Sequence, residues 1–315
     1  MYKRQALTHG LSICGFLFVN EDDNIIVPDL IWENYNLIYS NWFGGKLVSY
    51  KTFEGERFNL TGFSEKLNSI SGKKIVLLNF PNNPTGYTLT ESEAIQLVSI
   101  LEADAKKGNK LVVLIDDAYF GLVYKEGVLK ESLFARLASL HKNLLAVKVD
   151  GATKEDYVWG LRVGFLTYGV KDGSKELYLA LESKTAGAIR GNVSNLSTIS
   201  QSLLLKAYSS SEYKSQKQEK FQLLKERFLG VEKVLTDKKY ATYFSPLPYN
   251  SGYFMCIKLK APLKAEEVRR VLLRDYSTGV IVFGDLIRVA FSSVKTSDLK
   301  KMFDNIYDAC KKLCE

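Results

Sequence analysis

Apolar and polar positions follow a strand-like and a helix-like pattern in turn through the first two-thirds of the chain. Continuous apolar runs predict strands buried on both faces at 24–27, 47–50, 74–80, 111–116, 144–149 and 163–168. Amphipathic or apolar stretches predict helices at 11–19, 32–41, 60–71, 91–107 and 133–140. Repeated alternation of strand and helix is typical of an α/β fold, in which a mostly parallel sheet is sandwiched by helices.

The pattern changes after about Lys184 and predicts a second, smaller α+β domain. Helices are expected near 195–208, 211–236, 265–275 and 296–313, with strands at 253–259, 280–283 and 286–292. We therefore expect a large domain at 6–222 and a small C-terminal domain at 223–315, with the long charged helix as the connector. Residues 1–5 lead into apolar sequence without a capping signal, and we expect them to be a leader that is not native to the protein.

Composition narrows the functional class. The 315 residues contain 43 Lys and Arg against 35 Asp and Glu, a formal charge of +8, but the basic residues at 206–239 are mixed with acidic ones at helical spacing. This is typical of a solvated helix face, so we expect no nucleic-acid partner. No apolar run reaches the roughly 18 residues of a membrane helix. Four scattered cysteines and two histidines argue against a metal site and favour a cytoplasmic location.

Polar residues follow the ends of three predicted strands, where ligands bind in open α/β folds. The first group, at 79–86, places Asn82 and Asn83 where their amides can point into a cleft, but turn chemistry alone favours an ordinary strand-to-helix turn. In the second, Asp116 ends a buried strand, where a carboxylate is costly without a partner, and Tyr119 follows. A helix cap or a loop aspartate is the alternative interpretation.

The third group contains a lysine and an arginine. Lys154 follows a turn of small residues at a strand end, where partial desolvation lowers the pKa of an amine and makes it a nucleophile. Arg162 stands between two glycines in a segment able to hold a phosphate. Taken alone, a lysine in a loop is usually an ordinary surface residue.

In this chain order, three motifs resemble the aspartate-aminotransferase-like family of class I/II, fold-type I enzymes that use pyridoxal 5'-phosphate. They are Asn-Pro-Thr-Gly at 83–86, Asp-x-Ala-Tyr-x-Gly at 116–121 and the spacing from Lys154 to Arg162. The resemblance runs from about Leu7 to near the C-terminus. It implies a transaminase that moves an amino group between an L-amino acid, of aspartate or aromatic type, and a 2-oxo acid.

The resemblance also implies cofactor-binding residues. Lys154 is similar to the lysine that forms the Schiff base and shuttles a proton, and Asp116 to the partner of the pyridine nitrogen. Asn83 and Tyr119 match the donors to the ring's phenolic oxygen. The phosphate and the ring face would be held by Arg162, Thr153 and Trp32.

Further residues are implied to bind substrate. Arg288 is similar to the arginine that holds the α-carboxylate, and Asn83 would assist it. Arg190 is similar to the arginine that reads a distal carboxylate across a homodimer with a shared active site. Ser194 and Asn195 would then lie near the dimer interface.

The sequence departs from the family pattern at several points. Gly151 stands where the family often has serine, so Thr153 is expected to compensate, and Tyr157 stands where a small residue is usual. No counterpart of the family's N-terminal segment precedes Ala6, which implies weak cofactor binding or an inactive chain. Three alternatives stay open: a β-lyase of the same fold, a ligand-sensing domain of a transcription regulator, and a truncated, non-catalytic fragment.

Overall fold

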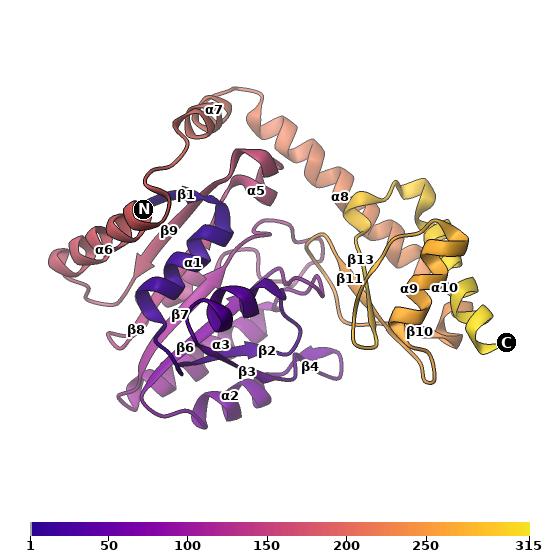
Figure 1. Ribbon diagram of the computed structural model, residues 1–315, viewed down its shortest axis with the longest axis horizontal. Coiled ribbons are helices and arrows are strands. Elements are labelled where there is room, and N and C mark those ends of the chain that lie inside the picture. The colour runs from indigo at the N-terminus through magenta and orange to yellow at the C-terminus, as the bar shows by residue number, and fades with distance from the viewer. Residues whose placement is uncertain (1) are drawn as a thin grey trace. The chain divides into compact units, whose positions relative to one another are not determined.

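The structure is a computed structural model that describes the backbone of residues 2–315 and the side chains of residues 6–315. The chain divides into two compact units (Figure 1). The first unit contains Met1–Pro81, Leu89–Val123 and Gly127–Tyr213, and the second contains Asn82–Thr88, Tyr124–Glu126 and Lys214–Glu315. The division at Tyr213 and the expected boundary at 222 and 223 both fall in helix α8 (Tyr213–Leu235).

A seven-stranded sheet forms the centre of the first unit, in the order β1-β9-β8-β7-β6-β2-β3. Its strands are β1 (Tyr2–Gln5), β2 (Asn24–Pro28), β3 (Lys46–Tyr50), β6 (Lys73–Asn79), β7 (Lys110–Asp116), β8 (Leu144–Asp150) and β9 (Val163–Gly169). Strands β2, β3, β6, β7 and β8 are parallel, whereas β9 is antiparallel to both β8 and β1. The predicted strands and the mostly parallel sheet are therefore confirmed. The expected leader, 1–5, lies partly outside the described residues, and the backbone of 2–5 forms β1.

The first unit also contains several α-helices. They are α1 (Ala6–Phe18), α2 (Leu60–Asn68), α3 (Glu91–Lys106), α4 (Leu133–Leu137), α5 (Ala152–Glu155), α6 (Lys175–Val193) and α7 (Thr198–Tyr208). Helix α1 packs against β7, β8 and β9, while α2 contacts β2 and β3. A capping box starts α3, because the Thr90 hydroxyl accepts from the Glu93 backbone and the Glu93 carboxylate accepts from the Thr90 backbone.

One predicted helix was wrong in part, and a helix and a hairpin were not predicted. The helix expected at 32–41 is only the π-helical turn η1 (Asn36–Asn41), which begins after Trp32. Helix α6 was missed because its apolar residues are largely exposed, so its sequence carries no single apolar stripe. A short hairpin of β4 (Phe53–Glu54) and β5 (Arg57–Phe58) was also not expected.

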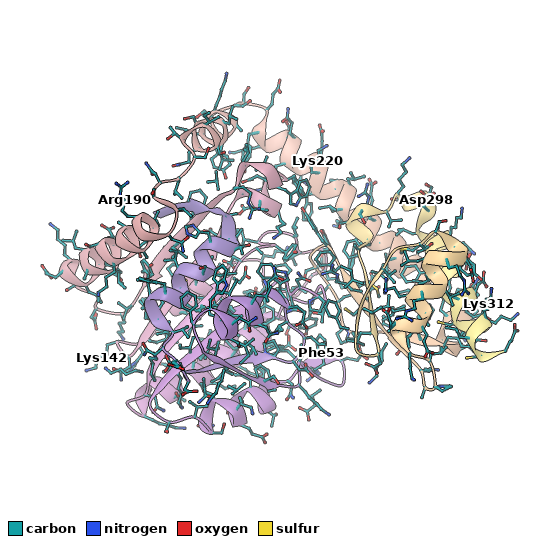
Figure 2. The ribbon with its side chains drawn as sticks, in the orientation of Figure 1. Phe53, Lys142, Arg190, Lys220, Asp298 and Lys312 are labelled. Carbon is teal, nitrogen blue, oxygen red and sulfur yellow. The ribbon has the colours of Figure 1, made fainter. Side chains whose placement is uncertain are left out.

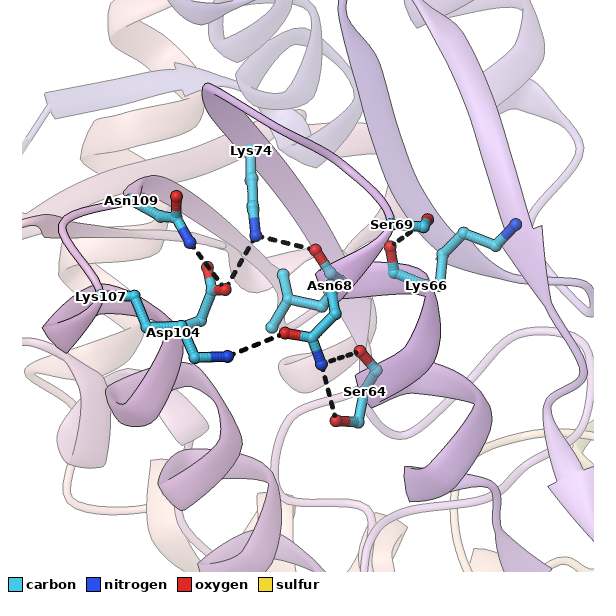
Figure 3. A network of polar contacts seen from close by, with 9 residues as sticks. Ser64, Lys66, Asn68, Ser69, Lys74, Asp104, Lys107 and Asn109 are labelled. Atoms are coloured by element: carbon cyan, nitrogen blue, oxygen red, sulfur yellow. Dashed lines mark hydrogen bonds and ion pairs between the residues drawn. The ribbon is translucent and has the colours of Figure 1, made fainter.

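A buried ion pair joins β6 to α3 at the amino end of β6. The Lys74 ammonium lies 2.8 Å from Asp104 Oδ1 and donates to the Leu67 carbonyl at 2.8 Å, while the Asn109 amide donates to the same Asp104 oxygen at 2.9 Å (Figure 3). The two charged side chains are only 2% and 3% exposed. This ion pair lies at the end of β6 opposite to the one that the Asn-Pro-Thr-Gly motif follows.

The second unit contains a four-stranded antiparallel sheet in the order β10-β11-β13-β12. Its elements are α8, β10 (Phe244–Pro246), β11 (Met255–Leu259), α9 (Ala265–Tyr276), β12 (Ile281–Phe283), β13 (Leu286–Val289) and α10 (Leu299–Cys314). This confirms the smaller α+β domain, in which β10 was not predicted. Within residues 2–315, none of the helices combines the length and apolarity needed to span a bilayer.

Residues 82–88 follow β6 in sequence but pack within the second unit. The Gly86 carbonyl accepts hydrogen bonds from the backbone N–H groups of Asn250 and Ser251, each at 2.9 Å. Gly86 has a φ of +70°, and a Cβ there would lie 1.9 Å from the Phe254 carbonyl oxygen. Only glycine fits this close backbone approach, which fixes the Asn-Pro-Thr-Gly motif against the small sheet.

Candidate active site

A buried carboxylate ends the central strand β7. Asp116, its last residue, is 3% exposed. Its Oδ2 accepts a hydrogen bond from the Tyr35 hydroxyl at 2.5 Å, and its Oδ1 accepts one from the Ala118 backbone N–H at 3.1 Å. Burial raises the pKa of Asp116, whereas these hydrogen bonds and the positive charge of Lys154 act to lower that pKa. The carboxylate is thereby fixed at the edge of the sheet where ligands bind in open α/β folds.

A lysine follows the adjacent strand β8, after a turn that has no room for a side chain. A Cβ on Gly151 would lie 2.5 Å from the Val163 carbonyl oxygen, which explains why glycine stands where the resemblance leads one to expect serine. Lys154 is the third residue of α5, and its ammonium lies 5.1 Å from the centre of the Tyr119 ring. Burial lowers the pKa of Lys154; the charge of Asp116 opposes this effect, and that of Arg162 adds to it. The amine therefore has the character of a nucleophile or base.

Groups suited to an anion gather where α1 begins. The Ala6 backbone N–H donates to the Arg162 carbonyl at 3.0 Å, and a Cβ on Gly164 would lie 2.8 Å from the Ala6 carbonyl carbon. The N-terminus of α1 therefore lies against the segment that carries the exposed Arg162 side chain. Helix α5, which contacts α1, contributes the buried Thr153 hydroxyl, which has no hydrogen-bond partner among the described residues. A helix N-terminus and an arginine together favour a phosphate.

A pair of aromatic residues, Trp32 and Tyr35, extends from the Asp116 carboxylate through the Tyr35 hydroxyl. The ring of the half-buried Trp32 meets the Tyr35 ring edge-on, with centroids 5.5 Å apart. Tyr35 is fully buried, and its hydrogen bond to Asp116 was not expected from the sequence. The only signal was its position three residues after Trp32, on one face of a stretch expected to be helical. Tyr119, which follows the end of β7, is also buried.

Charged side chains also link the ends of β7 and β8. The Lys148 ammonium lies 2.6 Å from Asp150 Oδ2 and 3.7 Å from Asp117 Oδ2. Burial raises the pKa of Asp117 to about 7, although hydrogen bonding by Ser132 and the charge of Lys148 oppose the shift. These residues were not predicted from the sequence.

The second unit brings together two other predicted residues. Arg288 on β13 donates to Asn83 Oδ1 at 2.8 Å, and its guanidinium lies 4.2 Å from the centre of the Phe254 ring and 5.9 Å from that of Phe283. An arginine that is stacked on an aromatic ring and hydrogen-bonded to an amide is held in one orientation. This fixed cation is suited to a carboxylate ligand.

Arg190 lies on the last turn of α6 in the first unit, where its side chain is exposed (Figure 2). Ser194 and Asn195 follow it and are also exposed. The structure therefore gathers Lys154, Asp116, Tyr119, Thr153 and Arg162 in the first unit, and it pairs Asn83 with Arg288 in the second.

Comparisons with known proteins agree on one family. A sequence profile described as "Aminotransferase class I and II" matches residues 6–306. An aspartate aminotransferase from Sulfolobus acidocaldarius is 32% identical over 162 residues, 50% of this chain and 37% of that protein. A histidinol-phosphate aminotransferase from Caldanaerobacter subterraneus is 25% identical over 283 residues, 89% of this chain and 70% of that protein. The chain spans less than half the length of several matched relatives. It covers, for example, 47% of an aspartate aminotransferase from Bacillus subtilis, to which it is 27% identical over 203 residues, or 64% of this chain.

The fold is also that of a solved structure. An aminotransferase from Anaerococcus prevotii superposes with a TM-score of 0.87 at 24% identity, and the superposition covers 98% of this chain and 75% of that one.

Proposed function

Because the chain belongs to the class I and II aminotransferases, we propose that it acts as a pyridoxal-phosphate-dependent transaminase, moving an amino group between an L-amino acid and a 2-oxo acid. One observation carries this proposal. A buried, hydrogen-bonded carboxylate ends strand β7, and a lysine with a lowered pKa follows the end of the adjacent parallel strand β8. A structural role alone gives no reason to bury both charged groups there.

The residues present fit the cofactor. The buried Thr153 hydroxyl, which has no hydrogen-bond partner among the described residues, and the exposed Arg162 guanidinium would supply donors for a phosphate near the start of α1. Asp116 would accept a hydrogen bond from the ring nitrogen and keep that nitrogen protonated. Asn83 and Tyr119 would donate to the phenolic oxygen, and Trp32 would cover the ring face.

Lys154 and Asp116 would have different roles: Lys154 would transfer the proton, and Asp116 would keep the cofactor ring protonated. When bound, pyridoxal phosphate draws electrons from the substrate's Cα and makes its C–H bond acidic. Lys154 Nζ would take up the Cα proton and return it, and the lowered pKa of Lys154 increases the share of neutral amine available for this at neutral pH. The fixed negative charge of Asp116 would favour the protonated ring, which is the better electron acceptor.

Arg288 and Asn83 would bind the substrate's α-carboxylate, since the guanidinium is already oriented by Asn83 and Phe254. The amino acid would be of aspartate or aromatic type, and Arg190 would bind the distal carboxylate of an aspartate-type substrate. Relatives named as aspartate and aromatic-amino-acid aminotransferases support these two substrate types.

A homodimer and a cytoplasmic location belong to the same proposal. Exposed apolar side chains are present on both α6 and α7: Leu177, Leu179, Ile199, Leu203 and Leu205. A second copy of the chain would cover some of these side chains, and Arg190, which is on α6, would then reach the partner's substrate. Sedimentation of the wild type and of Ile199→Glu tests the dimer, since Ile199 is 75% exposed. The four free thiols fit a reducing compartment.

The activity is tested by adding pyridoxal phosphate, reducing with borohydride and locating the adduct by mass spectrometry. We expect an adduct on Lys154 that Lys154→Ala abolishes, whereas Lys175→Ala, a change at an exposed lysine, leaves it intact. Amino acids should then yield 2-oxo acids only with an oxo-acid acceptor present. Ammonia released without an acceptor would identify a lyase instead, and no adduct on Lys154 would refute both enzymatic functions.

A further inference from the structure

Two tyrosines donate hydrogen bonds to the carboxylate of Asp156, which is two residues after Lys154. Asp156 follows α5 as its C-terminal cap residue. Its Oδ2 accepts a hydrogen bond from the Tyr208 hydroxyl at 2.6 Å, and its Oδ1 accepts one from the Tyr213 hydroxyl at 2.5 Å. The two rings meet edge-on, with centroids 5.1 Å apart. Both carboxylate oxygens therefore accept short, charge-assisted hydrogen bonds from residues more than fifty positions away in the chain.

The segment held in this way is not stable by itself. Helix α5 has only four residues, so it forms a single turn, and an isolated turn of helix is unfavourable. Tyr157 and Arg162 have φ values of +58° and +52°, in the left-handed region that is costly for residues with a side chain. Such a backbone persists only when its surroundings fix it, and Lys154 and Arg162 are the two residues whose placement depends on it.

An apolar contact accompanies the polar one. Leu204 on α7 forms a buried cluster with Ala152 and Val163, and the partly buried Val158 packs against the same cluster. Tyr208 is the last residue of α7, and Tyr213 is the first residue of α8, at the division between the two compact units. The turn with Lys154 is thus braced by the junction of α7 and α8 through both apolar packing and hydrogen bonds.

We propose that Asp156 is a positioning residue, which, held by Tyr208 and Tyr213, fixes the turn that carries Lys154 and Arg162. This inference rests on the proposed function only in taking Lys154 as the reactive lysine. Asp156 acts through geometry: it holds the α5 turn in place, and with it the burial that lowers the pKa of Lys154. Without the two phenol hydrogen bonds, water would reach the lysine and its pKa would return toward the ordinary value.

The test measures the titration of Lys154 without cofactor, by competitive acylation with acetic anhydride and mass spectrometry across pH. The variant is the double change Tyr208→Phe and Tyr213→Phe, which removes only the hydroxyl groups. Tyr178→Phe is the matched control, because that hydroxyl donates to the Val170 carbonyl at 3.3 Å in the same unit. We expect a pKa rise of about half a unit for Lys154 in the double variant, which lowers its acylation rate near neutral pH about three-fold. The control should match the wild type.

Tyr208→Phe alone guards against a double variant that fails to fold, since Tyr208 is 40% exposed. It should shift the titration of Lys154 in the same direction by a smaller amount. A folded double variant, or a folded single variant if the double does not fold, in which Lys154 titrates as in the wild type would overturn the inference. A wild type that acylates normally but forms no pyridoxal phosphate adduct would refute the proposed function instead, while the titration still decides the role of Asp156.

Discussion

The Lys74–Asp104 ion pair offers a quantitative test of how the first unit is stabilised. Lys74→Met removes one charge and leaves the Asp104 carboxylate, 3% exposed, with a hydrogen bond from the Asn109 amide in place of the ion pair (Figure 3). Breaking a buried pair in this way costs about 3–5 kcal/mol, because an uncompensated charge stays buried. Replacing both partners, with Lys74→Met and Asp104→Leu, removes that charge and leaves mainly the Leu67 carbonyl without its donor, at about 1–3 kcal/mol.

The free energy of unfolding is measured in urea by tryptophan fluorescence. All three tryptophans, at positions 32, 42 and 159, lie in the first unit, so the signal reports on that unit alone. The control is Lys106→Met, because Lys106 pairs with Glu102 at the surface of α3, where such a pair contributes about 0.3–0.5 kcal/mol. A loss below about 1 kcal/mol for Lys74→Met, or a double variant as unstable as the sum of its single variants, would refute the reasoning.

Three further changes test the candidate site. Tyr35→Phe should raise the pKa of Asp116, because it removes a hydrogen bond that favours the carboxylate, as measured from carboxyl carbon chemical shifts. The raised pKa of Asp117, about 7 against 3.8, means that ionisation opposes folding, so the wild type should lose stability as the pH rises from about 4 through 7. Asp117→Asn should remove this pH-dependent loss of unfolding free energy, which amounts to a few kcal/mol because each pKa unit corresponds to about 1.4 kcal/mol. Urea unfolding at several pH values measures it. Gly151→Ser places a Cβ against the Val163 carbonyl and should cost about 1–3 kcal/mol in the same assay.

Each of these changes has a control or a contrary outcome. Tyr39→Phe removes a buried hydroxyl that makes no hydrogen bond to Asp116, so the aspartate should then titrate close to the wild type. An unchanged pH slope in Asp117→Asn would show that other groups cause the slope. Gly160→Ser introduces the same side chain where nothing lies within 4 Å, and should cost below about 0.5 kcal/mol. Equal losses at Gly151 and Gly160 would contradict the argument from close backbone approach.

The strand ends and their polar residues could be predicted from the sequence because burial leaves a local trace. The continuous apolar runs of β6 and β7 can only be stable between two layers of helices, so a carboxylate that ends such a run is conspicuous. Asp116 and Lys154 were found in this way, and the resemblance to a family supplied their chemistry. The helix expected from Trp32 onward was wrong over its first residues, because periodicity does not distinguish a turn packed on a sheet edge from a helix.

The partners of these residues were decided only by the tertiary structure. Tyr35 reaches Asp116 across 81 positions, and Arg288 reaches Asn83 across 205. No sequence pattern around Tyr35 or Arg288 predicts its hydrogen-bond partner, because hydrogen bonds over such separations depend on how the strands are ordered in the sheet. The sequence by itself determined which positions are buried and where the strands end. The order of the strands in the sheet decided which polar groups meet at the strand ends. Local periodicity carries no information about this order, because the order joins segments that are far apart in the sequence.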